Sequence, residues 1–148
     1  MTWYDSPMEP VKLDMQRGRR IFQKLLRLGP DLDLVLLHAK SSAPGCLDVQ
    51  LDILECSPLY RRIMLGCYWN HPSGAIPDPS MTIAVFFDRE AAEALTYRDV
   101  ERYEAAYTAP DEPPDLETHT RLNVFLERWL TALVEQGHVF RRGARDTT

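Results

Sequence analysis

The stretch LDVQLDI, from Leu47 to Ile53, constrains the fold most, because apolar and polar residues alternate there without a break. Successive side chains of a β-strand point to opposite faces, so this pattern predicts a strand with one buried face and one polar face. Such a strand needs a second layer on its apolar side only. The chain is therefore expected to contain a sheet that is covered on one face.

A second alternating segment follows Cys56-Ser57-Pro58 and predicts a hairpin with the first strand. Its apolar positions are Leu59, Ile63, Leu65, Cys67 and Trp69. If the two apolar faces coincide, odd residues pair with odd residues, for example Leu47 with Leu65 or Cys67. The polar face then carries Asp48, Gln50 and Asp52 beside Tyr60, Arg62 and Met64.

Further strands are expected on both sides of this hairpin. Residues 34–38 form a short apolar run before a turn, and SMTIAVFFD (80–88) carries no charge until Asp88, as in a central strand. Residues 91–98 are expected to return as another strand, and residues 100–107 either extend it or form a short helical piece. Residues 71–79 contain three prolines and one glycine and are expected to form a loop.

Two segments show helical periodicity. The first runs from Asp14 to the stop at Gly29-Pro30, and the second is LETHTRLNVFLERWLTALVEQG (116–137), with Asp115 as its cap and Gly137 as its end. Trp129 lies on the apolar stripe of the second helix and is expected to be deeply buried.

These elements predict one α+β domain. It contains an antiparallel meander of four or five strands, an N-terminal helix, and a C-terminal helix packed on one sheet face. We expect an extended arm over residues 1–13, the domain over residues 14–138, and a flexible tail over residues 139–148.

The composition limits the partners that this protein is expected to bind. The 148 residues carry a formal net charge of -5, which argues against a surface that neutralises nucleic-acid phosphates. The basic residues between Arg17 and Arg27 are expected to form the solvated face of the first helix. No apolar run approaches the about 20 residues that span a bilayer. Three cysteines are too few for a disulfide scaffold, and with the acidic, proline-containing start they predict a cytoplasmic protein.

The motifs of common catalytic sites are missing from the sequence. The four histidines are scattered, and no CxxC, HxH, HExxH, GxSxG, GxGxxG or P-loop pattern occurs. We therefore predict no cofactor and no metal site.

Carboxylates near strand ends are the remaining catalytic candidates. Asp88 and Glu93 follow the uncharged strand, and Glu55 ends the first strand of the hairpin. They can act as acid–base groups only if burial shifts the pKa of one of them. The alternative is that Asp88, Arg89 and Glu90 form the exposed turn of a hairpin.

Aromatic and charged residues outside the apolar stripes are candidates for partner contacts. They are Trp3 and Tyr4 on the arm, Tyr60, Arg62 and Tyr68 on the polar sheet face, and His71 in the loop. A protein partner or a second copy of the chain would bind there. The alternative for the arm is that it folds back and covers the sheet.

The C-terminal half resembles the YqiB-like family of small proteobacterial proteins. The resemblance rests on PSMTIAVFFDREAAEAL (79–95), AAYTAP (105–110) and LNVFLERWL (122–130). Positions that match include Asp88, Glu93, Tyr107, Asn123 and Trp129. The family's arginine and histidine on the strand are replaced by Ala84 and Phe87, and its charged run before the last helix by residues 117–119. The resemblance implies a compact bacterial protein with no assigned reaction.

The leading hypothesis is a non-catalytic binding or regulatory module that engages a protein partner or itself. The alternative is a small enzyme that uses Asp88, Glu93 and Glu55 as acid–base or metal-binding carboxylates. The two hypotheses differ in geometry, because the enzyme requires the three carboxylates to converge in one pocket.

Overall fold

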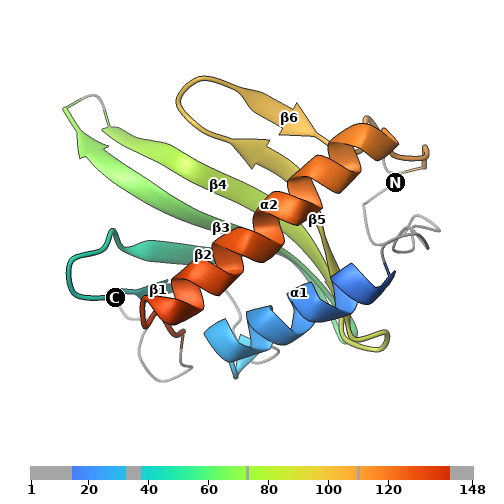
Figure 1. Cartoon of the computed structure of the whole chain (residues 1–148), viewed down its shortest axis with the longest axis horizontal. Helices are drawn as coiled ribbons and strands as arrows, with labels where there is room; N and C mark the ends of the chain where they lie inside the picture. Colours follow the sequence, from blue (N-terminus) through green and yellow to red (C-terminus); the bar gives the residue numbers. More distant parts are fainter. Residues whose placement is uncertain (1–14, 33–37, 73, 110, 141–148) are drawn as a thin grey trace.

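A computed structural model of the chain describes residues 15–32, 38–72, 74–109 and 111–140, which form one antiparallel sheet and two helices. The six strands lie in the sheet in the same order as in the chain, as Figure 1 shows. They are β1 (His38–Ser41), β2 (Val49–Ser57), β3 (Tyr60–His71), β4 (Gly74–Phe86), β5 (Ala91–Arg98) and β6 (Tyr103–Ala105). The predicted α+β meander is confirmed, but its strand number is six rather than four or five.

The β2–β3 hairpin has the predicted parity and a different register. Odd residues pair with odd residues, with Leu51 opposite Leu65 and Ile53 opposite Ile63. The tight turn between Ser57 and Tyr60 sets this register, so Leu47 lies before β2 and not opposite Leu65. Beyond Ile53 the register shifts, and Glu55 lies opposite Arg62. This irregularity places Glu55 and Arg62 on the polar face together.

The predicted loop over residues 71–79 is wrong, because β3 and β4 continue there as a hairpin. His71 pairs with Gly74, and Tyr68 pairs with Pro77. The pairing of β4 with β5 begins only at Ser80, so residues 74–79 form an edge on that side. Proline is tolerated on such an edge because its missing N–H costs no ladder hydrogen bond. The hairpin projects beyond the rest of the sheet in Figure 1.

The predicted strand over residues 34–38 lies outside the described residues except for His38, which begins β1. The return strand over residues 91–98 is confirmed as β5, and the segment after it forms the short strand β6. Asp88 to Glu90 lie in the turn between β4 and β5, as the alternative for these residues predicts.

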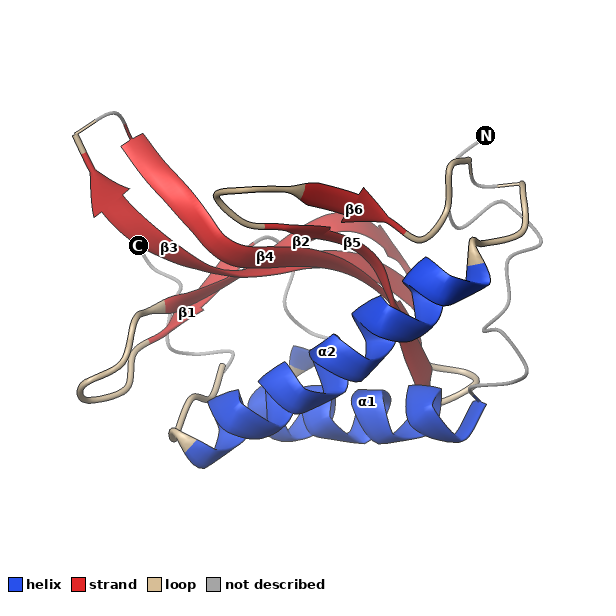
Figure 2. Cartoon of the chain, turned by 45° about the horizontal axis from the view of Figure 1, so that its top comes forward, coloured by secondary structure: helices blue, strands red, loops and turns tan. Residues whose placement is uncertain are grey.

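Two helices, α1 (Met15–Leu28) and α2 (Leu116–Glu135), pack on the same side of the sheet, as Figure 2 shows. The side chain of Asp115 accepts hydrogen bonds from the N–H groups of Glu117 and Thr118, so the predicted cap of α2 is confirmed. Gly137 follows the helix with φ of 94°, a conformation that favours glycine. The predicted cap of the first helix, Asp14, lies outside the described residues.

The core lies between the helices and the alternating face of the sheet. Its fully buried side chains include Ile21, Leu25, Leu51, Ile63, Leu65, Ile83, Leu126 and Leu130. Trp129 is only partly buried at the margin of this core, where it packs beside Phe125, so its predicted deep burial is wrong. Leu126 and Leu130 take the central positions because they lie on the helix face that points straight at the sheet.

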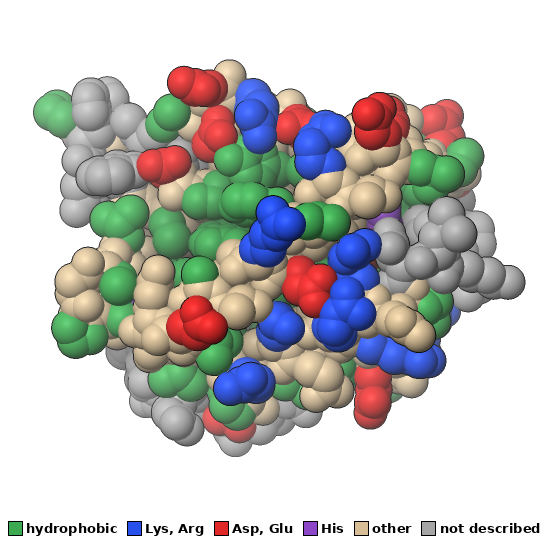
Figure 3. All heavy atoms as spheres, viewed as in Figure 1, with side chains coloured by type: hydrophobic (Ala, Val, Ile, Leu, Met, Phe, Trp, Pro, Cys, Tyr) green, Lys and Arg blue, Asp and Glu red, His purple; other side chains and the backbone are tan. Residues whose placement is uncertain are grey.

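Three of the basic residues of α1 form ion pairs with α2, whereas Arg19 and Arg27 are exposed as predicted. Arg20, Arg17 and Lys24 approach the Glu127 carboxylate of α2 at 2.5, 3.4 and 3.9 Å. Lys and Arg side chains gather where the two helices meet in Figure 3. The hydrogen bond from Arg20 is the main reason why the pKa of Glu127 is lowered from its ordinary value.

The chain remains packed to the end of its described part. Phe140 is 1% exposed, and its N–H donates to the carbonyl of Leu28 at 2.6 Å. The predicted arm over residues 1–13 and residues 141–148 of the predicted tail (139–148) lie outside the described residues. Neither described helix has the length and apolar character that crossing a membrane requires.

Replacing Leu126 by alanine should lower the free energy of unfolding by about 2–5 kcal/mol, because the truncation leaves a cavity under α2. Urea denaturation measures this loss. Arg128→Ala is the matched control, since Arg128 is exposed on the same helix and its loss should cost no more than about 0.5 kcal/mol. Equal losses in the two variants would contradict the placement of Leu126.

Glu127→Gln should destabilise the protein at neutral pH by about 1 kcal/mol, because it removes the carboxylate that three α1 cations approach. A carboxyl group with a lowered folded pKa stabilises the fold above its ordinary pKa of 4.5 and loses that effect as pH falls through the folded pKa. The difference between the wild type and Glu127→Gln should therefore shrink below about pH 4. Denaturation at several pH values measures it, with Glu135→Gln as control; a gap that stays constant with pH would contradict the ion pairing.

Candidate functional site

The sheet face opposite the helices is predominantly polar. One row across the strands consists of Asp52, Met64, Thr82 and Thr96, each opposite the next. The adjacent row contains Gln50, Gly66, Ser80 and Arg98. Directly opposed residues of an antiparallel sheet share a face, so these two rows lie side by side. In Figure 2 neither helix lies on this side, which we call the open face.

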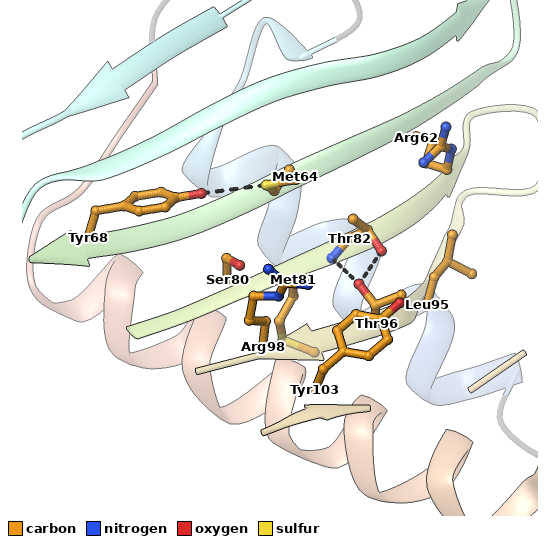
Figure 4. Close-up of a pocket in the computed structure, with 10 residues that line it drawn as sticks. All are labelled: Arg62, Met64, Tyr68, Ser80, Met81, Thr82, Leu95, Thr96, Arg98 and Tyr103. Carbon is orange, nitrogen blue, oxygen red and sulfur yellow. Dashed lines mark hydrogen bonds between the residues drawn. The ribbon is translucent and has the colours of Figure 1, made fainter. Parts of the chain in front are cut away.

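A groove of about 520 Å³ runs over the open face. Figure 4 shows the ten side chains that line it: Arg62, Met64, Tyr68, Ser80, Met81, Thr82, Leu95, Thr96, Arg98 and Tyr103. They come from β3, β4, β5 and β6. This volume falls within the range of about 300–1,000 Å³ that is typical of small-molecule sites.

The absence of a side chain at Gly66 shapes one part of the groove. A Cβ atom there would lie 2.9 Å from both the Cβ of Ser80 and the Cε1 of Tyr68. The Tyr68 ring can therefore lie close to the sheet, with its hydroxyl 3.5 Å from the sulfur of Met64. Burial raises the pKa of Tyr68, so its hydroxyl remains protonated at neutral pH.

A bulge in β5 brings another part of the lining together. The register shifts between Thr82 and Ile83, which leaves Leu95 as an extra residue on β5. The hydroxyls of Thr82 and Thr96 lie 2.5 Å apart, so one donates to the other. Leu95 is 2% exposed and lines the groove beside them. The bulge therefore places Thr96 opposite Thr82 on the open face.

The two arginines lie apart from each other in Figure 4 and differ in their surroundings. Arg62 Nε donates to Glu55 Oε1 at 2.6 Å, so a carboxylate of β2 offsets its charge. The guanidinium of Arg98 lies 5.3 Å from the centre of the Tyr103 ring and is exposed. Among the described residues, no carboxylate forms an ion pair with Arg98. Arg98 is thus available to an anionic ligand.

A buried polar network lies next to the groove, where β5 meets α2. Glu93 Oε1 accepts a hydrogen bond from the Tyr107 hydroxyl at 2.9 Å and lies 2.6 Å from His119 Nε2. Asn123 accepts the N–H of Ala94 through its Oδ1 and donates through its Nδ2 to the carbonyl of His119. Glu93 and His119 are each 2% exposed. The network joins β5 to the first turns of α2.

Two tyrosine hydroxyls near this network, those of Tyr107 and Tyr60, have raised pKa values. Burial, followed by the nearby Glu93 charge, raises the pKa of Tyr107 well above its ordinary value. Burial also raises the pKa of Tyr60, and the charges of Glu55 and Glu93 add to the effect. Both hydroxyls are therefore neutral at physiological pH, and that of Tyr107 donates to Glu93.

The three candidate carboxylates have separate surroundings. Asp88 is exposed in the β4–β5 turn, Glu55 is paired with Arg62, and Glu93 is enclosed by Tyr107 and His119. None of the three lines the groove. Within the described residues, no cluster of three His, Cys, Asp or Glu side chains is suited to hold a metal ion.

The candidates for partner contacts are divided between the groove and other places. Arg62 and Tyr68 line the groove. Tyr60 is 5% exposed, because it packs against Phe86 with ring centres 5.3 Å apart. Trp3 and Tyr4 lie outside the described residues, and His71 ends β3 with its side chain also outside them.

Sequence reasoning missed Arg98, Thr96 and Tyr103 in the groove, and His119 and Tyr107 in the network. Period-two counting from Ala91 gives no hint of the Leu95 bulge, which decides the face that Thr96 and Arg98 share. For Tyr107 the sequence offered one signal, because both Tyr107 and Glu93 match the family pattern.

The chain belongs to the family described as "Protein of unknown function (DUF1249)", whose model matches residues 24–139. No curated protein and no solved structure matches the chain. The matched residues include the end of α1, all of α2 and all six strands. The groove and the buried network therefore both lie within the family's domain.

Glu93→Gln and Tyr107→Phe should show coupled effects on stability, because the tyrosine hydroxyl donates to the carboxylate in a buried site. A double-mutant cycle measured by urea denaturation should give a coupling free energy of about 1–3 kcal/mol. Tyr103→Phe is the control, since Tyr103 is 56% exposed and should not couple to Glu93. Additive losses for Glu93 and Tyr107 would contradict the hydrogen bond.

Proposed function

We propose that this protein is a non-catalytic binding module that holds a negatively charged ligand in the groove on its open face. The observation that carries the proposal is the position of Arg98 in the lining of a groove of about 520 Å³, with no carboxylate paired to it among the described residues. An arginine in this situation binds carboxylate or phosphate oxygens through charge-assisted hydrogen bonds.

The separation of the carboxylates favours binding over catalysis. The enzyme hypothesis requires Asp88, Glu93 and Glu55 to converge, whereas one is exposed in a turn, one is paired with Arg62 and one is enclosed. A catalytic group must reach the reacting atoms of a substrate. Glu93, at 2% exposure, is better suited to hold β5 and α2 together.

The source of the ligand is a further part of this proposal. A free small molecule, an acidic side chain of a protein partner, or a second copy of the chain would each present an anion to Arg98. The groove's volume and its continuous lining support the small molecule. The protein partner and self-association are the alternative occupants.

Two narrower statements also stand as proposals. A cytoplasmic location is supported by the three cysteines, all of which are free. Membership of the YqiB-like proteobacterial group is supported by the spacing of the matched segments between Pro79 and Leu130.

The test compares two variants with the same change in net charge. Arg98→Glu reverses the charge in the groove, and Arg128→Glu reverses a charge on the exposed side of α2. A panel of anionic compounds and acidic peptides is screened by the rise in melting temperature and by amide shifts in NMR spectra. At least one anion should stabilise the wild type and Arg128→Glu but not Arg98→Glu. Equal responses in the two variants, or no response to any anion, would contradict the proposal.

A further inference from the structure

The charges that line the groove amount to a single available positive charge. The Arg62 guanidinium is bonded to Glu55 at 2.6 Å, and both side chains are less than one quarter exposed, at 24% and 14%. Arg98 has no such partner among the described residues. The Asp52 charge lies close enough to Tyr68 to raise the pKa of that hydroxyl. A ligand with one negative charge therefore matches the groove better than a dianion, whose second charge would meet no second unpaired cation.

The hydroxyl groups of the lining are largely occupied by one another. Thr82 and Thr96 share a hydrogen bond of 2.5 Å, and the Tyr68 hydroxyl contacts the sulfur of Met64 and the side chain of Ser80. A sugar or a nucleotide needs several free donors and acceptors, because its own polar groups lose water on binding. The four hydroxyl side chains of the lining therefore have few donors and acceptors left for such a ligand.

The remaining lining is apolar. Met64 contributes thioether surface and the rings of Tyr68 and Tyr103 contribute aromatic surface, whereas Met81 and Leu95 are only 1% and 2% exposed. Methionine side chains adapt their shape to an apolar ligand, and rings provide flat contact area. In Figure 4 Met64, Tyr68 and Tyr103 lie on different sides of Arg98. An apolar ligand body can therefore lie on these groups while its charged end contacts Arg98.

We infer that the groove binds an amphipathic monocarboxylate, with its carboxylate on Arg98 and its aliphatic or aromatic body over Met64 and the rings of Tyr68 and Tyr103. This inference rests on the proposed function and specifies its ligand class. The guanidinium fork of Arg98 matches the two oxygens of a carboxylate. Burial of the body supplies the rest of the affinity, in proportion to the apolar area removed from water.

The experiment is titration calorimetry with sodium decanoate below its micelle concentration, with decanol and with the shorter acids octanoate and hexanoate. The wild type should bind decanoate, and affinity should rise by up to about fourfold per methylene along the series. Arg98→Gln should weaken decanoate binding about tenfold or more, since it removes a charge-assisted bond. Arg128→Gln, the matched control on α2, should bind decanoate like the wild type. Circular dichroism confirms that both variants are folded.

A second variant tests the charge count. Glu55→Gln removes the carboxylate that occupies Arg62 and leaves that guanidinium available in the groove, apart from Arg98. Decanedioate, a dianion at pH 8 with one carboxylate at each end of its chain, should then gain at least threefold in affinity relative to decanoate. An unchanged ratio would show that Arg62 does not act on the ligand and would overturn the single-charge assignment.

The outcomes separate this inference from the proposed function. Decanol binding as tightly as decanoate, or an unchanged affinity in Arg98→Gln, would overturn the inference. If decanoate does not bind but an acidic peptide or inorganic polyphosphate binds and loses affinity in Arg98→Glu, the inference fails and the proposed function stands. If no anion binds in an Arg98-dependent manner, both fail.

Discussion

A sheet with two unlike faces allows only one of them to be buried, and the rest of this structure depends on that constraint. The helix-covered face consists of side chains such as Leu51, Ile63, Leu65 and Ile83, which are at most 2% exposed. Full burial of each such side chain contributes about 1.5–3 kcal/mol. Once α1 and α2 lie on this face, the two polar rows along the groove remain on the other side of the sheet. The exposed residues of these rows are therefore available for binding.

The joint between β5 and α2 is the second determinant of the fold. A buried carboxylate loses hydration, and the hydrogen bonds around Glu93 offset that loss without making the joint a strong source of stability. What the joint does supply is geometry, because Glu93 and Ala94 each bind a particular side chain of α2. Three positions of the family resemblance, Glu93, Tyr107 and Asn123, meet here. The matched sequence pattern thus corresponds to one connected set of contacts that fixes where α2 begins.

The parts of the fold that follow from periodicity were predictable from the sequence. The alternation around Leu51 predicted the buried face, and the three- and four-residue spacing around Leu126 predicted the covering helix. The β3–β4 hairpin was missed because its prolines indicate a loop unless one knows that the outer edge of residues 74–79 is unpaired. The predicted deep burial of Trp129 was also wrong, because the apolar stripe of α2 extends beyond the part of the helix that packs on the core.

The candidate site was predictable only in part, because it depends on bulges. Arg62 and Tyr68 follow from parity within a single strand. The faces of Thr96 and Arg98 depend on the register shift at Thr82, and local sequence does not specify a shift of one residue. Glu93 stood out as a charge near an apolar strand, yet its partners come from residues 14 and 26 positions later in the chain. Contacts of that range are set by topology.

The lengths of the edge strands have a consequence for the way in which other molecules approach this protein. β1 has four residues and β6 has three. The first residues of β5 extend beyond β6, and there the N–H of Ala94 donates a hydrogen bond to the side chain of Asn123. A chain that adds itself to a sheet as a new strand needs a longer row of free backbone groups. Among the described residues, β1 and β6 are too short to offer one, and the longer edge at residues 74–79 carries Pro77 and Pro79, which have no N–H to donate. Recognition at the sheet therefore depends on side chains that project from its surface, so its specificity can change by single substitutions while the backbone remains the same.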